Sequence, residues 1–573
     1  MSTAEQQVGR SRWARYSVRR WSLGGLLGLA LTLPVLLPLG YLVWLATGVG
    51  LGELLAGLER ADVPWLCVRM MGIATGASAV ALVIGAPWAW LAARTDVQGA
   101  GVFRWLGPLP LAIPPYVGAL VYALLLAPSG VLHAGVAGAL GRPTWETPFP
   151  GLIYGPVGSA LVLGIFTSPY VFLNVYGALQ RMDPAMEDAA RSLGSAPASV
   201  LLHITLPLLR PALLAGGLLV FVYAWVDFGV VSLLRTRTFT TVLFTYLRAG
   251  FSLPAAAGLS LVLVTIVWAL LYGQHRLLGR ASYTQGRGTR RTTRRANLGR
   301  GRPVALAYLI LVSTLTLFVP LGALLFQAAM LGSPAELAAF VWSALPYVWH
   351  SLQVAVIGSL LSLAVGGYVA WRTWRGRDGA LAGAILQAGY AAPATVIGLS
   401  VVGLSLSLFP AVYDHPLLLL PLAYVILFAA PTLQGVRAAL AQVPCSMEEA
   451  VRALGYGPLT AARRVVIPLA WPGAASAWLL TFILSLRELA ATIILRPAGF
   501  DTLPVRIWTH STEVGLDPRA SVLALILVTL VGAGWSILLF GRQSDARRNR
   551  TPLQSQPTDV RFGDTVRTGS SHR

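Results

Sequence analysis

The chain has 573 residues, of which 56% are hydrophobic and only 11% are charged. Soluble domains carry about 25% charged residues, so this composition excludes an ordinary soluble protein and indicates an integral membrane protein. The formal net charge of +21 is compatible with nucleic-acid binding, but all 43 basic residues are arginines and most of them flank apolar segments. That placement is typical of membrane orientation rather than of phosphate contacts, and we expect no nucleic-acid partner.

Twelve apolar segments are long enough to cross a bilayer, which takes about 20 residues per helix. They predict an all-α membrane protein, because lipid offers exposed backbone groups no hydrogen-bond partner. The expected spans lie near residues 23–47, 65–93, 105–127, 151–179, 208–233, 256–279, 304–331, 347–371, 380–409, 416–436, 470–495 and 520–541. Prolines inside these segments predict kinks or broken helices, at Pro114, Pro115, Pro169, Pro393 and Pro431.

Polar, arginine-rich segments predict the orientation and the domain boundaries. Because cytoplasmic loops carry an excess of arginine, their alternation along the chain places both termini in the cytoplasm. The first apolar segment exceeds the 7–15 residues of a secretory signal, so we expect an uncleaved anchor. The expected units are a basic tail (1–22), a six-helix half (23–280), an Arg-rich linker (281–302), a second six-helix half (303–541) and a disordered tail (542–573). The linker is also expected to contact anionic lipid.

Two polar stretches, at 186–211 and 447–472, interrupt the apolar pattern and have glycines and prolines at matching positions. In the first, Asp183 and Pro184 predict the start of a short helix, and Gly194 its left-handed end. Pro197 predicts the start of a second short helix. In the second stretch, Ser446 and Glu449 have the spacing of a capping box.

The second stretch repeats the first at a constant offset, since Glu448 follows Glu187 by 261 positions and Gly455 follows Gly194 by the same number. This offset continues beyond the loops and pairs Asp227 with Glu488. Since each half has an even number of expected spans, both halves enter the membrane from the same side, as a parallel duplication.

Three charged residues near the ends of the fifth and eleventh expected spans are candidates for the solute path: Asp227, Arg487 and Glu488. Charge inside a membrane is expensive and usually faces a cavity or a partner. These side chains could therefore line the path, or they could form internal pairs, such as Glu488 with Arg487, that hold the helices together.

The repeated pattern of Glu-x-Ala, a glycine five residues later and then Leu-Pro or Ile-Pro resembles the EAA loop of bacterial ABC importer permeases. The resemblance implies a MetI-like permease fold in the inner membrane, with cytoplasmic loops whose short helices dock on an ATPase homodimer. It also implies a periplasmic or lipoprotein solute-binding protein. The residues implied in coupling are Glu187, Asp188, Ala189, Ala190, Gly194, Pro207, Glu448, Glu449, Ala450, Gly455 and Pro468. In this reading, the glutamates supply acid for arginines of the ATPase.

The segments VDFGVVSLLR and LRELAATIILRPAGFDTLPVRIW look like those of ferric-iron-type permeases with two fused halves, so ferric iron is the first expectation for the cargo. Thiamine permeases are the nearest rivals, and sulfate or another small solute also remains open. No Ser/His/Asp set, metal-ligand cluster or nucleotide loop emerges. We therefore expect no catalytic, metal or cofactor site in this chain, and ATP hydrolysis by a partner, since a P-loop needs a lysine. An ion-gradient-driven transporter and a membrane scaffold are the alternatives.

Overall fold

The computed structural model describes residues 23–48, 51–127, 130–143, 153–183, 185–248, 253–279, 296–375, 379–512 and 517–548. The expected N-terminal tail, most of the linker and the end of the C-terminal tail lie outside these residues.

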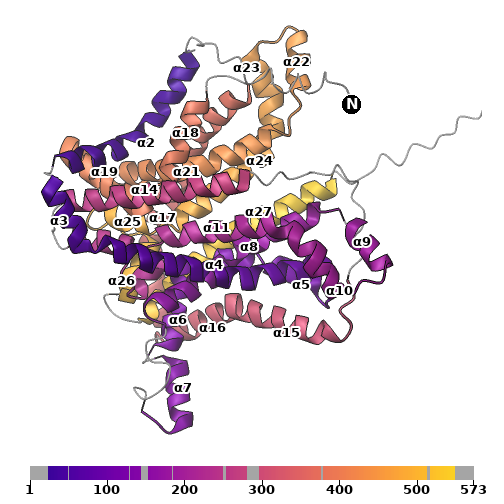
Figure 1. Cartoon of the computed structure of the whole chain (residues 1–573). Coiled ribbons are helices and arrows are strands. Elements are labelled where there is room, and N and C mark those ends of the chain that lie inside the picture. Colours follow the sequence, from indigo (N-terminus) through magenta and orange to yellow (C-terminus); the bar gives the residue numbers. More distant parts are fainter. Residues whose placement is uncertain are drawn as a thin grey trace, which may run out of the picture.

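The described residues form a helical bundle that contains the two halves of the chain (Figure 1). The helices of the first half are α2 (Leu23–Thr47), α3 (Leu51–Ala61), α4 (Val63–Arg94), α5 (Ala100–Leu106), α6 (Pro115–Leu126), α7 (Val131–Leu140), α8 (Pro156–Arg181), α9 (Ala185–Ser192), α10 (Pro197–Val200), α11 (Leu206–Val226), α12 (Gly229–Leu233), α13 (Phe239–Arg248) and α14 (Leu253–Gly279). Those of the second half are α15 (Arg302–Ser313), α16 (Val319–Ala329), α17 (Pro334–Trp374), α18 (Ala380–Tyr390), α19 (Ala394–Leu408), α20 (Pro410–Tyr413), α21 (Pro416–Leu440), α22 (Cys445–Ala453), α23 (Pro458–Ala461), α24 (Ile467–Leu486), α25 (Ala490–Leu495), α26 (Leu503–Thr512) and α27 (Pro518–Arg548).

Ten helical segments of the described chain are long and apolar enough to cross a membrane, and two bent pairs bring the total to twelve if each pair is one span. The expected twelve spans are therefore confirmed if each bent pair is counted as one broken span. The third segment bends by 92° and the ninth by 102°. The bends fall at Pro114 and Pro393, because proline disfavours helical geometry in the residue before it and donates no hydrogen bond. Pro169 and Pro431, by contrast, lie inside continuous helices.

The fifth and eleventh expected spans, at 208–233 and 470–495, end earlier than hydropathy suggested. α11 stops at Val226 and α24 at Leu486, and a short separate helix follows each of them. Conversely, α27 continues to Arg548, into the tail that we expected to begin at 542. Hydropathy reports the length of an apolar segment, and a helix ends where its backbone hydrogen bonds end.

Each half is built on a pair of parallel helices in close contact, α4 with α8 and α17 with α21. Glycines permit the approach, as small residues do at helix interfaces in membranes. A Cβ atom on Gly85 would lie 2.5 Å from the Ser168 carbonyl oxygen, and one on Gly366 would lie 2.6 Å from the Ala429 carbonyl oxygen. The two contacts are equivalent in the two halves, so the duplication extends to the packing of the helices.

The first helix of each half packs against the other half. α2 contacts α18 and α19, and α16 contacts α6. The described end of the linker joins the first half in the same way, because Thr95 and Ala296 form a parallel bridge and Asp96 forms an ion pair with Arg302. The hydrogen bond from Arg302 lowers the pKa of the Asp96 carboxyl, so this ion pair is present at neutral pH. Each half thus packs against the other through its N-terminal helices, and the end of the linker adds a further contact with the first half.

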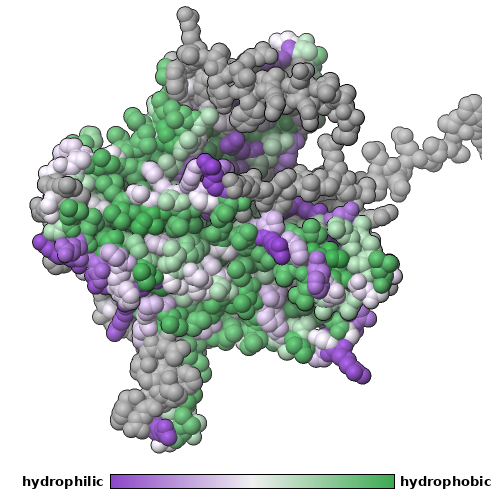
Figure 2. Space-filling model, in the orientation of Figure 1, coloured by the Kyte–Doolittle hydropathy of each residue, from purple (hydrophilic) through white to green (hydrophobic). Residues whose placement is uncertain are grey.

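The outer face of the bundle is hydrophobic. Figure 2 shows apolar side chains over most of the surface formed by α14, α11 and α4. Large apolar side chains such as Trp44, Val83 and Leu214 are exposed there and elsewhere on the bundle. Such a surface is stable in lipid and would aggregate in water, which agrees with the membrane assignment from composition.

Two adjacent glycines of α17 provide a matched test of the helix packing. Gly366 is enclosed by the backbone of α21, whereas nothing lies within 4 Å of a Cβ atom on Gly367. We expect Gly366→Ala to lower the free energy of unfolding by about 1–3 kcal/mol through overpacking. Gly367→Ala should be neutral or stabilising by up to about 1 kcal/mol, because alanine favours a helix. Thermal unfolding in detergent measures both, and equal melting temperatures for the two variants would contradict the packing.

Candidate functional site

The first polar loop has the local structure that its helix-starting and helix-ending residues predict. Asp183 accepts a hydrogen bond from the Ala185 backbone N–H at 3.0 Å, at the start of α9. α9 ends before Gly194, whose φ is +86°, and α10 begins at Pro197. Gly455 also has φ +86° after α22. A left-handed residue at this position is the usual end of a helix, and the identical angle shows that both loops turn back in the same way.

The start of the second loop helix differs from the prediction. The residue that precedes α22 is Pro444, and its position supplies no side-chain cap. Ser446 therefore lies inside the helix and is not its N-cap, so the capping box proposed for Ser446 and Glu449 is wrong. Pro444 has an extended backbone, with φ −63° and ψ 130°, as is usual for the residue just before a helix. The side chains of Glu448 and Glu449 lie outside the described residues.

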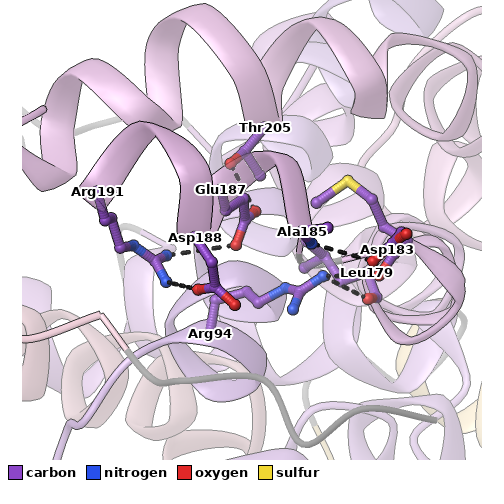
Figure 3. Close-up of polar contacts among 9 residues, drawn as sticks. Arg94, Leu179, Asp183, Ala185, Glu187, Asp188, Arg191 and Thr205 are labelled. Atoms are coloured by element: carbon purple, nitrogen blue, oxygen red, sulfur yellow. Dashed lines mark hydrogen bonds and ion pairs between the residues drawn. The ribbon is translucent and has the colours of Figure 1, made fainter. Parts of the chain in front are cut away.

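Glu187 is turned into the protein, where only 1% of it is exposed. One carboxylate oxygen accepts a hydrogen bond from the Thr205 hydroxyl at 2.8 Å, and the other pairs with Arg191 at 3.3 Å (Figure 3). Asp188 pairs with the same arginine at 3.2 Å. In this structure the charge of Glu187 is satisfied within the chain, and the expectation that it meets an arginine of the ATPase stays a prediction. The charge of Glu187 holds α9 against the start of α11.

Arg94 links this loop to the bundle. Its guanidinium, 3% exposed, donates to the carbonyl oxygens of Leu179 at 2.9 Å and Met182 at 3.3 Å (Figure 3). These carbonyls lie at the C-terminal end of α8, where a positive charge is favourable. Because Arg94 is the last residue of α4, the ends of α4 and α8 and the start of the loop are held together as one unit.

Both loops also expose large apolar side chains, which the sequence analysis missed. Met186 and Leu193 are 59% and 87% exposed, and their partners at the 261-residue offset, Met447 and Leu454, are 45% and 76% exposed. Ala189 and Ala450 are exposed beside them. The sequence did contain a signal for this exposed apolar surface. Large apolar residues occur inside polar loops that are too short to form a hydrophobic core.

A second repeated feature joins each loop to the following span. A single π-helical turn lies at Leu201–Thr205 in the first half and at Ala462–Val466 in the second. Pro207 and Pro468 follow within the first turn of α11 and α24. Such turns are rare and occur mostly at functional positions, and their periodicity cannot be read from hydropathy.

Asp227, Arg487 and Glu488 come together at a cavity of about 270 Å³ between the two halves. Asp227 accepts a hydrogen bond from the Val230 backbone N–H at 2.9 Å. Glu488 accepts one from the Ala491 N–H at 3.0 Å. Each carboxylate therefore caps the short helix that follows a broken span, α12 or α25. Each carboxylate thus satisfies backbone donors and also lines the cavity, and its role in the solute path stays a prediction.

Arg487 crosses from the second half to the first. Its guanidinium donates to the Leu111 carbonyl oxygen and to the Tyr170 hydroxyl, both at 3.3 Å. The structure gives no ion pair between Arg487 and Glu488 within its described residues. The internal pair that we considered for these two residues is thus replaced by hydrogen bonds between the halves.

Four tyrosines line the same cavity and were not identified from the sequence: Tyr116, Tyr170, Tyr223 and Tyr390. The Tyr116 hydroxyl is buried and has no hydrogen-bond partner in the structure. Tyrosines are common in apolar segments, so the sequence gives no reason to single these four out. Only their meeting in space identifies them as cavity-lining residues. With the two carboxylates and Arg487, they make the cavity a polar centre inside an apolar bundle.

A duplicated bundle with a shared polar cavity, and with one short loop helix in each half, is typical of a membrane permease. The family model of the binding-protein-dependent transport system inner membrane component matches residues 17–278 and 330–541, and the chain belongs to this family. It is accordingly the permease component of an ABC transporter. The unmatched stretch between the two regions contains the linker, α15 and α16.

Named relatives are permease proteins of several transport systems. The chain is 27% identical over 512 residues to the Fe(3+)-transport system permease protein FbpB 2 of Haemophilus influenzae, which covers 88% of this chain and 96% of that protein. It is 31% identical over 255 residues to a probable molybdenum ABC transporter permease of Haloferax volcanii, covering 44% and 88%. It is 29% identical over 189 residues to the spermidine/putrescine permease PotC of Haemophilus influenzae, covering 32% and 70%.

Substitutions at Asp227 separate the capping role from the charge. Asp227→Asn keeps an oxygen acceptor for the Val230 N–H, so we expect little change in stability. Asp227→Ala removes the cap and should lower the free energy of unfolding by about 1 kcal/mol. Thermal unfolding of the purified variants tests the difference. If the Asn and Ala variants have the same melting temperature, the hydrogen bond to the backbone does not stabilise α12.

Proposed function

We propose that this chain forms the membrane path of an ATP-driven importer for ferric iron. The observation that carries the cargo assignment is architectural. The similarity to the Fe(3+)-transport permease extends over both halves of this chain, whereas the molybdenum and polyamine permeases match 44% and 32% of it. A fused pair of halves is thus shared with the iron permease. The cavity adds carboxylate and phenol oxygens, which suit hard cations.

Energy enters, in this proposal, through two ATPase subunits that bind the loops around α9 and α22. The exposed methionine, alanine and leucine of each loop form its contact face, because an apolar surface gains most from burial in a groove. Glu187 acts as a positioning residue, since its bonds to Thr205 and Arg191 keep that face outward. Hydrolysis of ATP takes place in the partner chains.

The loops and the cavity are mechanically connected. Each loop continues through its π-helical turn into α11 or α24, and a cavity-lining carboxylate lies one or two residues after the end of each of these helices. Movement of the two loops toward each other would therefore tilt α11 and α24 and change access to the cavity. ATP binding drives this movement and hydrolysis reverses it, as a shift between two conformations.

The proposed location is the inner membrane of a bacterium, with both termini, the loops and the Arg-rich linker in the cytoplasm. Arginine bias supports this orientation. The opposite face of the bundle then receives cargo from a periplasmic or lipid-anchored binding protein. Anionic lipid headgroups are the expected neighbours of the linker arginines.

A charge placed on the exposed loop face tests the docking. Leu454→Glu should leave the fold intact, because the side chain is exposed, and should weaken ATPase association at least about tenfold, since an unpaired carboxylate is costly to bury. Gln442→Glu adds the same charge at an exposed position before α22 and is the control. Copurification of the ATPase with each variant gives the result. Wild-type association of Leu454→Glu would place the contact elsewhere.

Transport itself tests the function and the cargo separately. Proteoliposomes that contain this chain, its ATPase and its binding protein should accumulate radiolabelled ferric iron only with internal ATP. Collapse of ion gradients by an ionophore should leave the uptake unchanged. Uptake that needs an ion gradient instead would indicate a secondary transporter. ATP-dependent uptake of molybdate, sulfate or thiamine without iron would keep the importer and replace its cargo.

A further inference from the structure

A second, larger pocket of about 680 Å³ lies at the opposite end of the bundle from the α9 loop. Its position follows from α4, which is 32 residues and so about 48 Å long. Arg94 at one end of α4 contacts the loop region, and Arg237 of the pocket donates to the Ala61 carbonyl oxygen, just before the other end, at 3.1 Å. The pocket thus opens on the face proposed to receive cargo.

The charged residues that line this pocket are all arginines: Arg60, Arg235 and Arg237. The three are exposed, and the structure gives none of them an ion pair with an acid among its described residues. The Arg235 guanidinium lies over the Tyr154 ring at 5.3 Å, and that of Arg237 makes the one bond to Ala61. Most of their donors therefore remain available to a ligand.

In the second half, the arginine at the equivalent position is paired with an acid. Arg496, at the 261-residue offset from Arg235, forms an ion pair with Asp501, which also pairs with Arg506 at 3.4 Å. The position equivalent to Asp501 in the first half is Thr240, whose hydroxyl donates to the Asp227 carbonyl oxygen. The first half has thus kept the arginine without the aspartate that neutralises it.

The backbone at Arg235 is also unusual. Arg235 has φ +53°, in the left-handed region where glycine is the usual residue, whereas Arg496 has an ordinary φ of −63°. A bond from the Thr236 N–H to the Val231 carbonyl oxygen at 2.8 Å closes the turn around Arg235. A strained arginine where glycine would fit better indicates that the side chain has a use.

The pocket adjoins the central cavity. Phe228 lines both spaces and is 2% exposed. Its ring packs on Phe244 at 5.0 Å and on Trp508 at 6.2 Å between centroids. Phe228 directly follows Asp227, the cap of α12. A ligand held by the arginines would therefore lie one aromatic side chain away from the cavity between the halves.

We propose that this pocket binds a small, multiply charged oxyanion or polycarboxylate before it reaches the central cavity. Three positive charges repel a bare trivalent cation and attract an anion or an anionic complex. Arginine suits the task, because its planar fork of donors matches carboxylate and phosphate oxygens. The proposal rests on the permease function. For an iron importer, it means that the metal arrives with anionic ligands rather than alone.

Equilibrium dialysis of the purified full chain, at low salt, with labelled phosphate and labelled citrate as probes, tests the site. We expect saturable binding that weakens at least tenfold in the Arg235→Gln/Arg237→Gln double variant. Arg69→Gln is the control, because Arg69 lies on α4 over the Trp65 ring and outside the pocket. Arg235→Gly should also weaken binding while the melting temperature stays the same or rises, because glycine fits the backbone there.

A third arm with ferric citrate distinguishes the source of the anion. Tighter binding of the iron complex than of citrate would assign the site to the cargo, and equal binding would assign it to a free anion. The absence of saturable binding to the wild type, or equal binding by the double variant and Arg69→Gln, would overturn the proposal. Loss of binding-protein association in the double variant, without anion binding by the wild type, would overturn it in favour of an acidic protein surface. None of these measurements depends on transport, so the proposal can fail while the permease function stands.

Discussion

The parallel contact of α4 with α8, repeated as α17 with α21, is the constraint on which the rest of the structure depends. Gly85 and Gly366 let the helix backbones touch, and this brings the ends of each pair to the same level. Arg94 can then reach the last carbonyls of α8 and fix the start of the loop. From there α11 runs about 32 Å over its 21 residues to Asp227, so the packing of one helix pair places both the loop and the cavity-lining charge.

The polar centre follows from a second constraint, that broken helices in a membrane must satisfy their own backbone groups. Asp227 and Glu488 meet this need by accepting hydrogen bonds from the first turns of α12 and α25. The same carboxylates face the shared cavity, where Arg487 connects the halves. Charges that stabilise the breaks in the spans are thereby placed at the cavity between the halves, so a polar centre can form without weakening the fold.

The two halves share packing and loops but differ in charge at the end of the bundle opposite the loops. Arg496 forms an ion pair with Asp501, whereas Arg235 opens into a pocket whose described lining residues include no acid. A fused chain allows this difference, because each half can change independently, while two copies of a single half must remain identical. Asymmetry at this end and symmetry at the loops support the proposal of one cargo and two equivalent ATPase contacts.

The sequence by itself determined the membrane class, the duplication, the approximate spans and the turns at Gly194 and Gly455, because these follow from local composition and backbone preference. It also identified Asp227, Arg487 and Glu488, since charge in an apolar segment is conspicuous. Only the tertiary structure decided that Glu187 points inward, that Met186 and Leu193 are the exposed face, and that tyrosines and arginines from distant segments meet in two cavities. The direction of a side chain depends on which helices pack around it, and that information is spread over residues far apart in the chain.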